Sequence, residues 1–116
     1  MIHVLAFATT LPGKRNEVLE AFQANVPAVQ AEDGCIEYGA TTDAEEVGPF
    51  QSQLGADTFV VVEKWASVGA LEAHALAPHM AAYGAKTKGL LASRVIHVLA
   101  PVPGGAGQSE GPPRSR

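Results

Sequence analysis

One pentapeptide, Ile-His-Val-Leu-Ala, occurs twice in this chain of 116 residues, at positions 2–6 and again at positions 96–100. Each copy is short and largely apolar, which is typical of a β-strand. A string of five residues keeps its odd and even positions when it is reversed, so two antiparallel copies can pair with every face matched. Val4 then lies opposite Val98. We expect the first and last strands to be neighbours in one sheet.

The sequence between the two copies predicts the remaining elements. Residues 14–32 repeat apolar side chains at helical spacing, and residues 35–42 alternate between apolar and polar as a strand does. Residues 58–65 are dense in β-branched and aromatic side chains, which indicates the strongest strand. Residues 66–91 are rich in alanine and predict a second helical region. The order is therefore strand, helix, strand, strand, helix, strand.

Three positions refine the predicted helices. Pro27 lies inside the first helix, where it removes one backbone hydrogen bond, so we expect a kink or a tightened last turn. Ser67 is suited to cap the second helical region, and Pro78 divides that region into two pieces at Ala77. The apolar positions of the first helix are Val18, Ala21, Phe22, Val26 and Val29.

This order of elements is typical of an α+β, ferredoxin-like βαββαβ sandwich with an antiparallel four-stranded sheet. In that fold the first and last strands lie side by side and antiparallel, which explains the repeated pentapeptide as two neighbouring strands. Residues 1–102 form the predicted domain. Residues 103–116 are rich in Pro, Gly and Ser, and we expect them to form a flexible tail without a catalytic role.

The predicted strands are apolar on both faces, which indicates that both faces of the sheet are covered. In residues 58–65, Phe59 and Val61 lie on one face, and Val60 and Val62 lie on the other. The two helices can cover only one face, and the chain has no further element for the second. A second copy of the sheet is the economical cover, so we predict a homodimer that packs sheet to sheet.

Composition excludes several classes of protein. The chain has 12 Asp and Glu but only 8 Lys and Arg, and its basic residues do not form a stripe interleaved with aromatic residues. The sequence therefore gives no support for nucleic-acid binding. The longest apolar run is far shorter than a membrane span, and because no basic region followed by a long apolar stretch is seen, we expect no secretory signal. Cys35 is the only cysteine, so no disulfide can form within the chain. We expect a cytoplasmic protein with Cys35 as a small core residue.

Side chains suited to chemistry gather in residues 63–83. Glu63 lies on an otherwise apolar strand face, where a buried carboxylate needs a partner, and a histidine from the following helix is the natural one. A carboxylate that holds an imidazole in one tautomer tunes a general base. Trp65 and a lone helical histidine also have ordinary structural roles in packing. The other members of this group are His74, His79 and Tyr83.

No metal or nucleotide motif is present. His74 and His79 are five positions apart, which on an unbroken helix of about 3.6 residues per turn places them about 140° apart. The break at Pro78 could realign them, but no third ligand is spaced nearby. The chain has no CxxC, HExxH or glycine-rich phosphate loop.

The sequence resembles the antibiotic biosynthesis monooxygenase (ABM) domain and the related quinol monooxygenases. The resemblance extends from residue 2 to about residue 100, and its most specific part is Glu63-x-Trp65 followed by His74 and by Pro78-His79. Supporting stretches are LPGKRNEVLEAF, AEDGCIEYGATTD and VVVEKWASVGALEAHALAPHMAAY.

The resemblance implies a dimeric α/β-barrel that oxidises a phenolic, quinol or anthrone-like substrate with O2, without a metal or a flavin. Such a protein needs only to deprotonate the substrate, hold it and exclude water. His74 is then the candidate base, oriented by Glu63, and Trp65 completes the catalytic group. The substrate slot would be lined by Tyr83, His79, Tyr38 and Phe7.

Two other functions fit the same scaffold. One is a lactone isomerase or aldolase-like enzyme that uses the same base without oxygen, and the other is a non-catalytic dimeric ligand-binding or stress-response module. Residues 43–57 form a longer connection than the hairpin associated with the family, and serve as a lid or as surface elaboration. Haem-degrading relatives use an Asn on the first strand, and this chain has none there.

Overall fold

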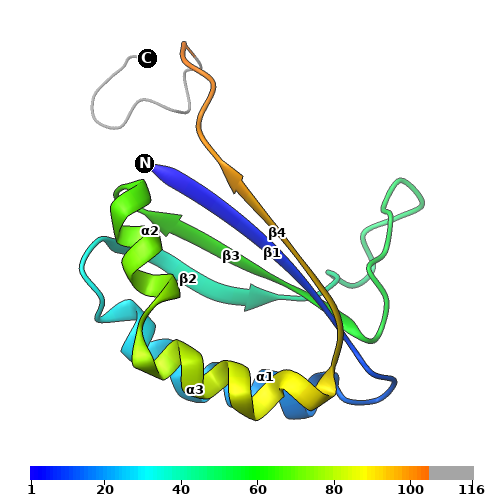
Figure 1. The fold of residues 1–116 in the computed structure, drawn as a ribbon. Coiled ribbons are helices and arrows are strands. Elements are labelled where there is room, and N and C mark those ends of the chain that lie inside the picture. Colours follow the sequence, from blue (N-terminus) through cyan, green and yellow to red (C-terminus); the bar gives the residue numbers. More distant parts are fainter. Residues whose placement is uncertain (105–116) are drawn as a thin grey trace.

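A computed structural model describes residues 1–104 and contains one sheet with helices on one of its faces (Figure 1). The strands follow the order β2-β3-β1-β4, and every neighbouring pair is antiparallel. This is the predicted ferredoxin-like α+β fold. Of the predicted tail, residues 105–116 lie outside the described part of the chain. The elements are β1 (Ile2–Thr10), α1 (Arg15–Gln30), β2 (Cys35–Thr41), β3 (Thr58–Trp65), α2 (Val68–Ala75), α3 (Pro78–Thr87), a 3-10 turn (Lys88–Leu90) and β4 (Leu91–Leu99).

The repeated pentapeptide pairs with itself in the predicted register. Val4 of β1 lies opposite Val98 of β4, and Leu5 lies opposite His97. Because the period of a strand is two residues, this register places like side chains on like faces. The repetition therefore reflects two neighbouring, antiparallel strands and not a duplicated domain, although Val4 in the central strand β1 is buried whereas Val98 in the edge strand β4 is 53% exposed.

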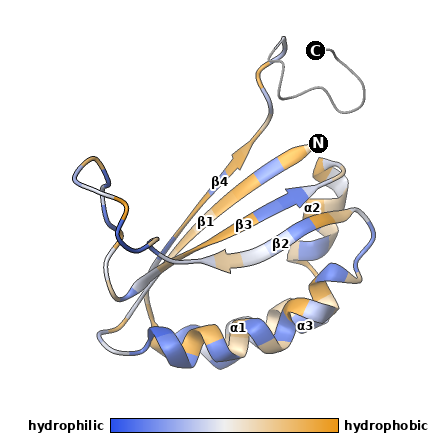
Figure 2. Cartoon of the chain, turned by 180° about the vertical axis from the view of Figure 1, so that it is seen from behind, coloured by the Kyte–Doolittle hydropathy of each residue, from blue (hydrophilic) through white to orange (hydrophobic). Residues whose placement is uncertain are grey.

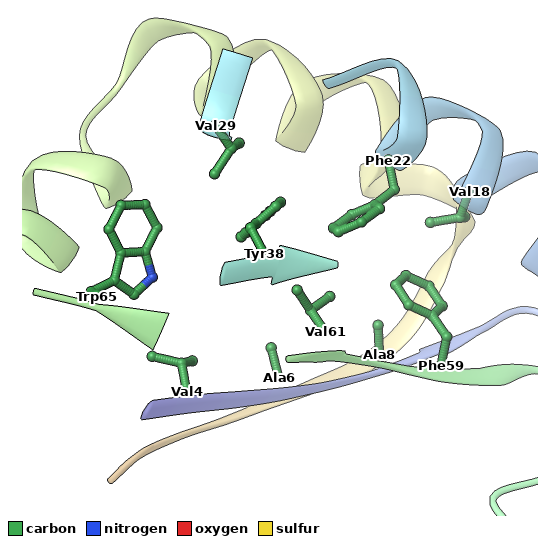
Figure 3. Close-up of a cluster of buried hydrophobic side chains, with 10 residues drawn as sticks. All are labelled: Val4, Ala6, Ala8, Val18, Phe22, Val29, Tyr38, Phe59, Val61 and Trp65. Atoms are coloured by element: carbon green, nitrogen blue, oxygen red, sulfur yellow. The ribbon is translucent and has the colours of Figure 1, made fainter. Parts of the chain in front are cut away.

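The hydrophobic core fills the space between the sheet and α1. Alternate residues of β1 and β3 point toward the helices, and α1 contributes the predicted apolar stripe. Burying these side chains stabilises the fold by about 1.5–3 kcal/mol for each large one. Figure 3 shows the core side chains Val4, Ala6, Ala8, Val18, Phe22, Val29, Tyr38, Phe59, Val61 and Trp65.

The second helical region divides where the sequence predicts. The Ser67 hydroxyl accepts a hydrogen bond from the Ala70 N–H at 3.1 Å, which caps α2. Ala77 is extended, and Pro78 then starts α3 at a position where its missing N–H costs nothing. Pro27 also lies within a helix, and α1 continues past it to Gln30.

The alternation predicted for β2 is interrupted at its start. Cys35 pairs with Trp65 and Glu37 pairs with Lys64, so Ile36 is an extra residue in the ladder. Because of this bulge, Cys35 shares the helix-facing side with Tyr38, whereas the sequence pattern predicted Ile36 there. Ile36 is instead exposed to solvent.

The second face of the sheet carries no helix (Figures 1 and 2). Apolar side chains nevertheless lie on it, and β1 and β4 are largely hydrophobic along their length in Figure 2. None of the helices within residues 1–104 has the length and apolar character that crossing a bilayer requires. The apolar side chains of this bare face are Leu5, Phe7, Val60, Val62, Val95 and Leu99.

The connection between β2 and β3 projects away from the sheet (Figure 1). Its base is fixed, because the Asp43 carboxylate accepts hydrogen bonds from the N–H groups of Leu54 and Gly55. These hydrogen bonds lower the pKa of Asp43 below its ordinary value. The connection enters β3 at Thr58, about 23 Å from Trp65 at roughly 3.3 Å per residue.

Candidate active site

A carboxylate and an indole are buried together at the end of β3. Glu63 and Trp65 both point toward the helices, and the Trp65 Nε1–H donates a hydrogen bond to Glu63 Oε1 at 2.9 Å. Trp65 is 0% exposed and Glu63 is 7% exposed. The predicted buried carboxylate is therefore present, but its hydrogen-bond partner is the indole two residues away and not a histidine.

Burial raises the pKa of Glu63 above its ordinary value. The hydrogen bond from Trp65 and the nearby charges of His74 and Arg94 act in the opposite direction and are outweighed. A carboxyl group in this environment resists ionisation because few groups solvate its charge. Glu63 is consequently a poorer counter-ion for an imidazolium than the sequence interpretation assumed.

His74 is held by Glu32, a residue that sequence reasoning missed. The Nδ1 atom of His74 lies 3.0 Å from Glu32 Oε2, and both side chains are largely buried. The expected orientation of His74 by Glu63 is therefore wrong in its partner, although a carboxylate–imidazole pair does exist. Glu32 precedes the start of β2, which lies beside the end of β3, and His74 is in the helix that follows β3. The predicted strand order could therefore have indicated that Glu32 and His74 are close.

His79 binds the same carboxylate oxygen. Its Nε2 atom lies 2.8 Å from Glu32 Oε2. On one continuous helix the two histidines would point about 140° apart. The extended backbone at Ala77 and the new start at Pro78 change the direction of the chain, so both rings converge on one oxygen.

The turn that carries Glu32 depends on Gly34. Its φ is +83°, and a Cβ at this position would lie 2.6 Å from the Cβ of Ala70 in α2. The Ala66 N–H donates to the Gly34 carbonyl at 2.8 Å, and the Cys35 N–H donates to the Glu32 carbonyl at 3.2 Å. Close packing and these hydrogen bonds together hold Glu32 beneath α2.

Aromatic rings surround His74. Its ring centroid lies 4.6 Å from that of Trp65 and 5.5 Å from that of Tyr38. Tyr38 in turn stacks on Phe22 at 5.2 Å, and Tyr83 meets Phe22 edge to face at 6.1 Å. Burial raises the pKa of both tyrosines, so their hydroxyls stay neutral in the physiological range.

The seven predicted site residues do not all come together. Phe7 lies on the bare face of the sheet, where its ring meets His97 at 6.0 Å, because odd-numbered residues of β1 point away from the helices. The other six lie on the helix-facing side. Arg94 of β4, paired with Ala8, also lies on that side, and its positive charge opposes the rise in the pKa of Tyr83. Arg94 belongs to none of the sequence motifs described above.

Two hollows adjoin these elements. One, of about 210 Å³, lies between α1 and α3 and is lined by His79, Tyr83 and Asn25, among others. Another, of about 450 Å³, lies at the start of β1 and the end of β4. Within residues 1–104, no three side chains of His, Cys, Asp or Glu are grouped so as to hold a metal ion.

The fold and these side chains define a class of small α+β proteins with a buried imidazole that is paired to a carboxylate and flanked by aromatic rings. The family model named antibiotic biosynthesis monooxygenase matches residues 1–86. The chain is 39% identical over 103 residues to "Probable quinol monooxygenase YgiN" of Escherichia coli K12, covering 87% of this chain and 98% of YgiN. This protein belongs to the antibiotic biosynthesis monooxygenase family.

Solved structures have the same fold. Rv0793 from Mycobacterium tuberculosis has a TM-score of 0.71 and 27% identity, with 87% of this chain and 94% of that chain covered. PA3566 from Pseudomonas aeruginosa, at 24% identity and the same TM-score of 0.71, covers 87% of this chain and 93% of its own. The helices and sheet described above are therefore the arrangement of a recurring fold.

Proposed function

We propose that this protein is a cofactor-independent monooxygenase that oxidises a quinol or a related phenolic small molecule with O2. The observation that carries the proposal is the buried imidazole of His74, which lies 3.0 Å from a carboxylate oxygen and 4.6 Å from the ring of Trp65. Membership of a monooxygenase family and 39% identity to YgiN support the same reaction class.

The reaction needs a base more than it needs a cofactor. Removal of a proton from a quinol hydroxyl gives an electron-rich phenolate, which can pass an electron to O2. One oxygen atom then remains in a hydroxyquinone and the other leaves as water, so the substrate itself supplies the electrons. In this scheme His74 accepts the phenolic proton, and its burial keeps competing water away.

The surrounding side chains provide binding and charge. Tyr83 and His79 line the hollow between α1 and α3, where a planar ring could pack against them. Trp65 and Tyr38 are buried and pack against His74 from the sheet side. Arg94 places a positive charge on the same side of the sheet, where it would stabilise a phenolate. The substrate class is therefore a flat, hydroxylated aromatic molecule.

We also propose that two copies pack with their bare sheet faces together. Val95 is 50% exposed and Leu99 is 44% exposed on that face, beside Leu5 and Phe7. Apolar side chains from neighbouring strands form one continuous surface there, which is typical of a protein interface. Phe7 then belongs to the subunit contact and not to the substrate site.

Oxygen uptake by the metal-free protein tests the reaction. With a panel of quinols and anthrones, we expect uptake that is lost in His74→Ala and reduced in Trp65→Phe. Leu76→Ala is the matched control, because Leu76 follows His74 closely but is 84% exposed. Uptake that is unchanged in His74→Ala, or turnover that is equally fast without oxygen, would exclude the proposed reaction.

A further inference from the structure

One oxygen of Glu32 contacts two imidazoles at the same time. The Nδ1 atom of His74 lies 3.0 Å away and the Nε2 atom of His79 lies 2.8 Å away. The side chains are 16% exposed for Glu32, 6% for His74 and 28% for His79. Hydrogen bonds to a carboxylate are strong in so sheltered a place, because little water competes for them.

The contacts decide which ring nitrogens carry protons. An ionised carboxylate only accepts hydrogen bonds, so the nitrogen that faces it must be the donor in each ring. His74 therefore carries its proton on Nδ1, and His79 carries one on Nε2. In a neutral His74 the lone pair is then on Nε2, away from Glu32. The Nδ1 atom of His79 is buried without a hydrogen-bond partner among the described residues.

We propose that Glu32 is the positioning residue of this site: it fixes His74 in the Nδ1–H tautomer, so that Nε2 is free to accept the substrate proton. This inference rests on the proposed function, in which His74 is the base. When Nε2 takes a proton, the adjacent negative charge of Glu32 stabilises the imidazolium. His79 binds the same oxygen and holds the carboxylate in the orientation that His74 needs.

The backbone around Glu32 is built for such a role. The Glu32 N–H donates to the Val29 carbonyl at 3.0 Å, so the residue continues directly from the end of α1. Gly34 then packs against Ala70 of α2 and fixes the other side of the turn. A side chain that acts through another must be held within a fraction of an ångström, and a turn anchored at both ends meets that requirement.

Nuclear magnetic resonance of ¹⁵N-labelled protein tests the inference without any turnover. Long-range ¹H–¹⁵N spectra report which nitrogen of His74 is protonated. We expect the Nδ1–H form in the wild type and in Glu72→Gln, an exposed glutamate on the same helix as His74. In Glu32→Gln the amide can donate as well as accept, so the preference should weaken. An unchanged tautomer in Glu32→Gln would overturn the proposal.

Kinetics with an active quinol give the second measurement. We expect Glu32→Gln to lower kcat about 100-fold, at the lower end of what a general base contributes, with little change in KM. Glu32→Asp keeps the charge and should recover part of the rate. Equal rates for Glu32→Gln and the wild type would refute the positioning role.

The two measurements separate the two proposals. If no quinol supports oxygen uptake but the tautomer of His74 changes in Glu32→Gln, the proposed reaction fails and the role of Glu32 stands. Should Glu32→Gln fail to fold, the spectra of Glu32→Ala decide: without a carboxylate the preference for the Nδ1–H form should weaken, and an unchanged tautomer would contradict the inference.

Discussion

Replacing Gly34 by alanine would strain the turn beneath the site in two separable ways. The φ of +83° is in the left-handed region, where a residue with a Cβ costs roughly 1–2 kcal/mol more than glycine. The new methyl group would also lie 2.6 Å from the Cβ of Ala70. Overpacking of this kind costs roughly 1–3 kcal/mol. We therefore expect Gly34→Ala to lower the free energy of unfolding by about 2–5 kcal/mol.

Gly13 supplies the matched control for this prediction. Its φ is +77°, but a Cβ there would meet no atom within 4 Å. Gly13→Ala should accordingly lose only the conformational part, about 1–2 kcal/mol. The difference between the two variants measures the steric contact with α2 alone.

Urea unfolding followed by circular dichroism is the assay, because the midpoint and the slope together give the free energy of unfolding. Adding Ala70→Gly to Gly34→Ala removes the Ala70 methyl group with which the new Cβ at position 34 clashes. The double variant should then recover stability, although glycine inside a helix costs about 1 kcal/mol by itself. If Gly34→Ala is no less stable than Gly13→Ala, the steric reasoning fails.

Three further predictions concern other parts of the molecule. Ser67→Ala removes the cap of α2 and should lower the free energy of unfolding in urea by about 1 kcal/mol, and no loss would contradict the capping role. Burial raises the pKa of Glu63 in the folded state above its ordinary value of 4.5, so the unfolded chain loses this proton at lower pH than the folded chain does. The free energy of unfolding therefore falls as pH rises from 4.5 through the raised pKa. Glu63→Gln should remove that fall and melt higher than the wild type at pH 7 in calorimetry, and a lower melting temperature would refute it. Light scattering should find a dimer for the wild type and for Leu76→Glu but a monomer for Val95→Glu, whereas a monomeric wild type would exclude the sheet-to-sheet dimer.

The elements that the sequence predicted well are those governed by local rules. The register of the two pentapeptides follows from alternation alone, which leaves Val4 opposite Val98. The division of the second helix follows from the ring of Pro78, which restricts the residue before it. Neither result depends on how distant side chains pack.

The site was harder to predict because its partners are distant in sequence. Glu32 and His74 are separated by 42 positions, and only the antiparallel pairing of β2 with β3 brings them together. The extra residue Ile36 also changes which side chains face the helices, and nothing in the alternating pattern reveals such a bulge.

The partner of Glu63 was mispredicted for a related reason. The carboxylate does need a hydrogen bond, as its burial requires, and a histidine was the expected donor. Trp65 lies on the same face of the same strand, two residues away, and donates at 2.9 Å. A partner on the same strand was available without any tertiary contact, so the nearest donor satisfied the requirement.

The interruption at Ala77 and Pro78 has a consequence for engineering this protein. Substitutions that join α2 and α3 into one helix from Ser67 to Thr87 would add backbone hydrogen bonds, so selection for thermal stability would favour them. In such a continuous helix His74 and His79 would point in different directions, so only one of them could contact Glu32 Oε2. Such a variant would be more thermostable and keep its fold, but one of the two histidines would lose its contact with Glu32. Thermal stability and activity should therefore be screened together.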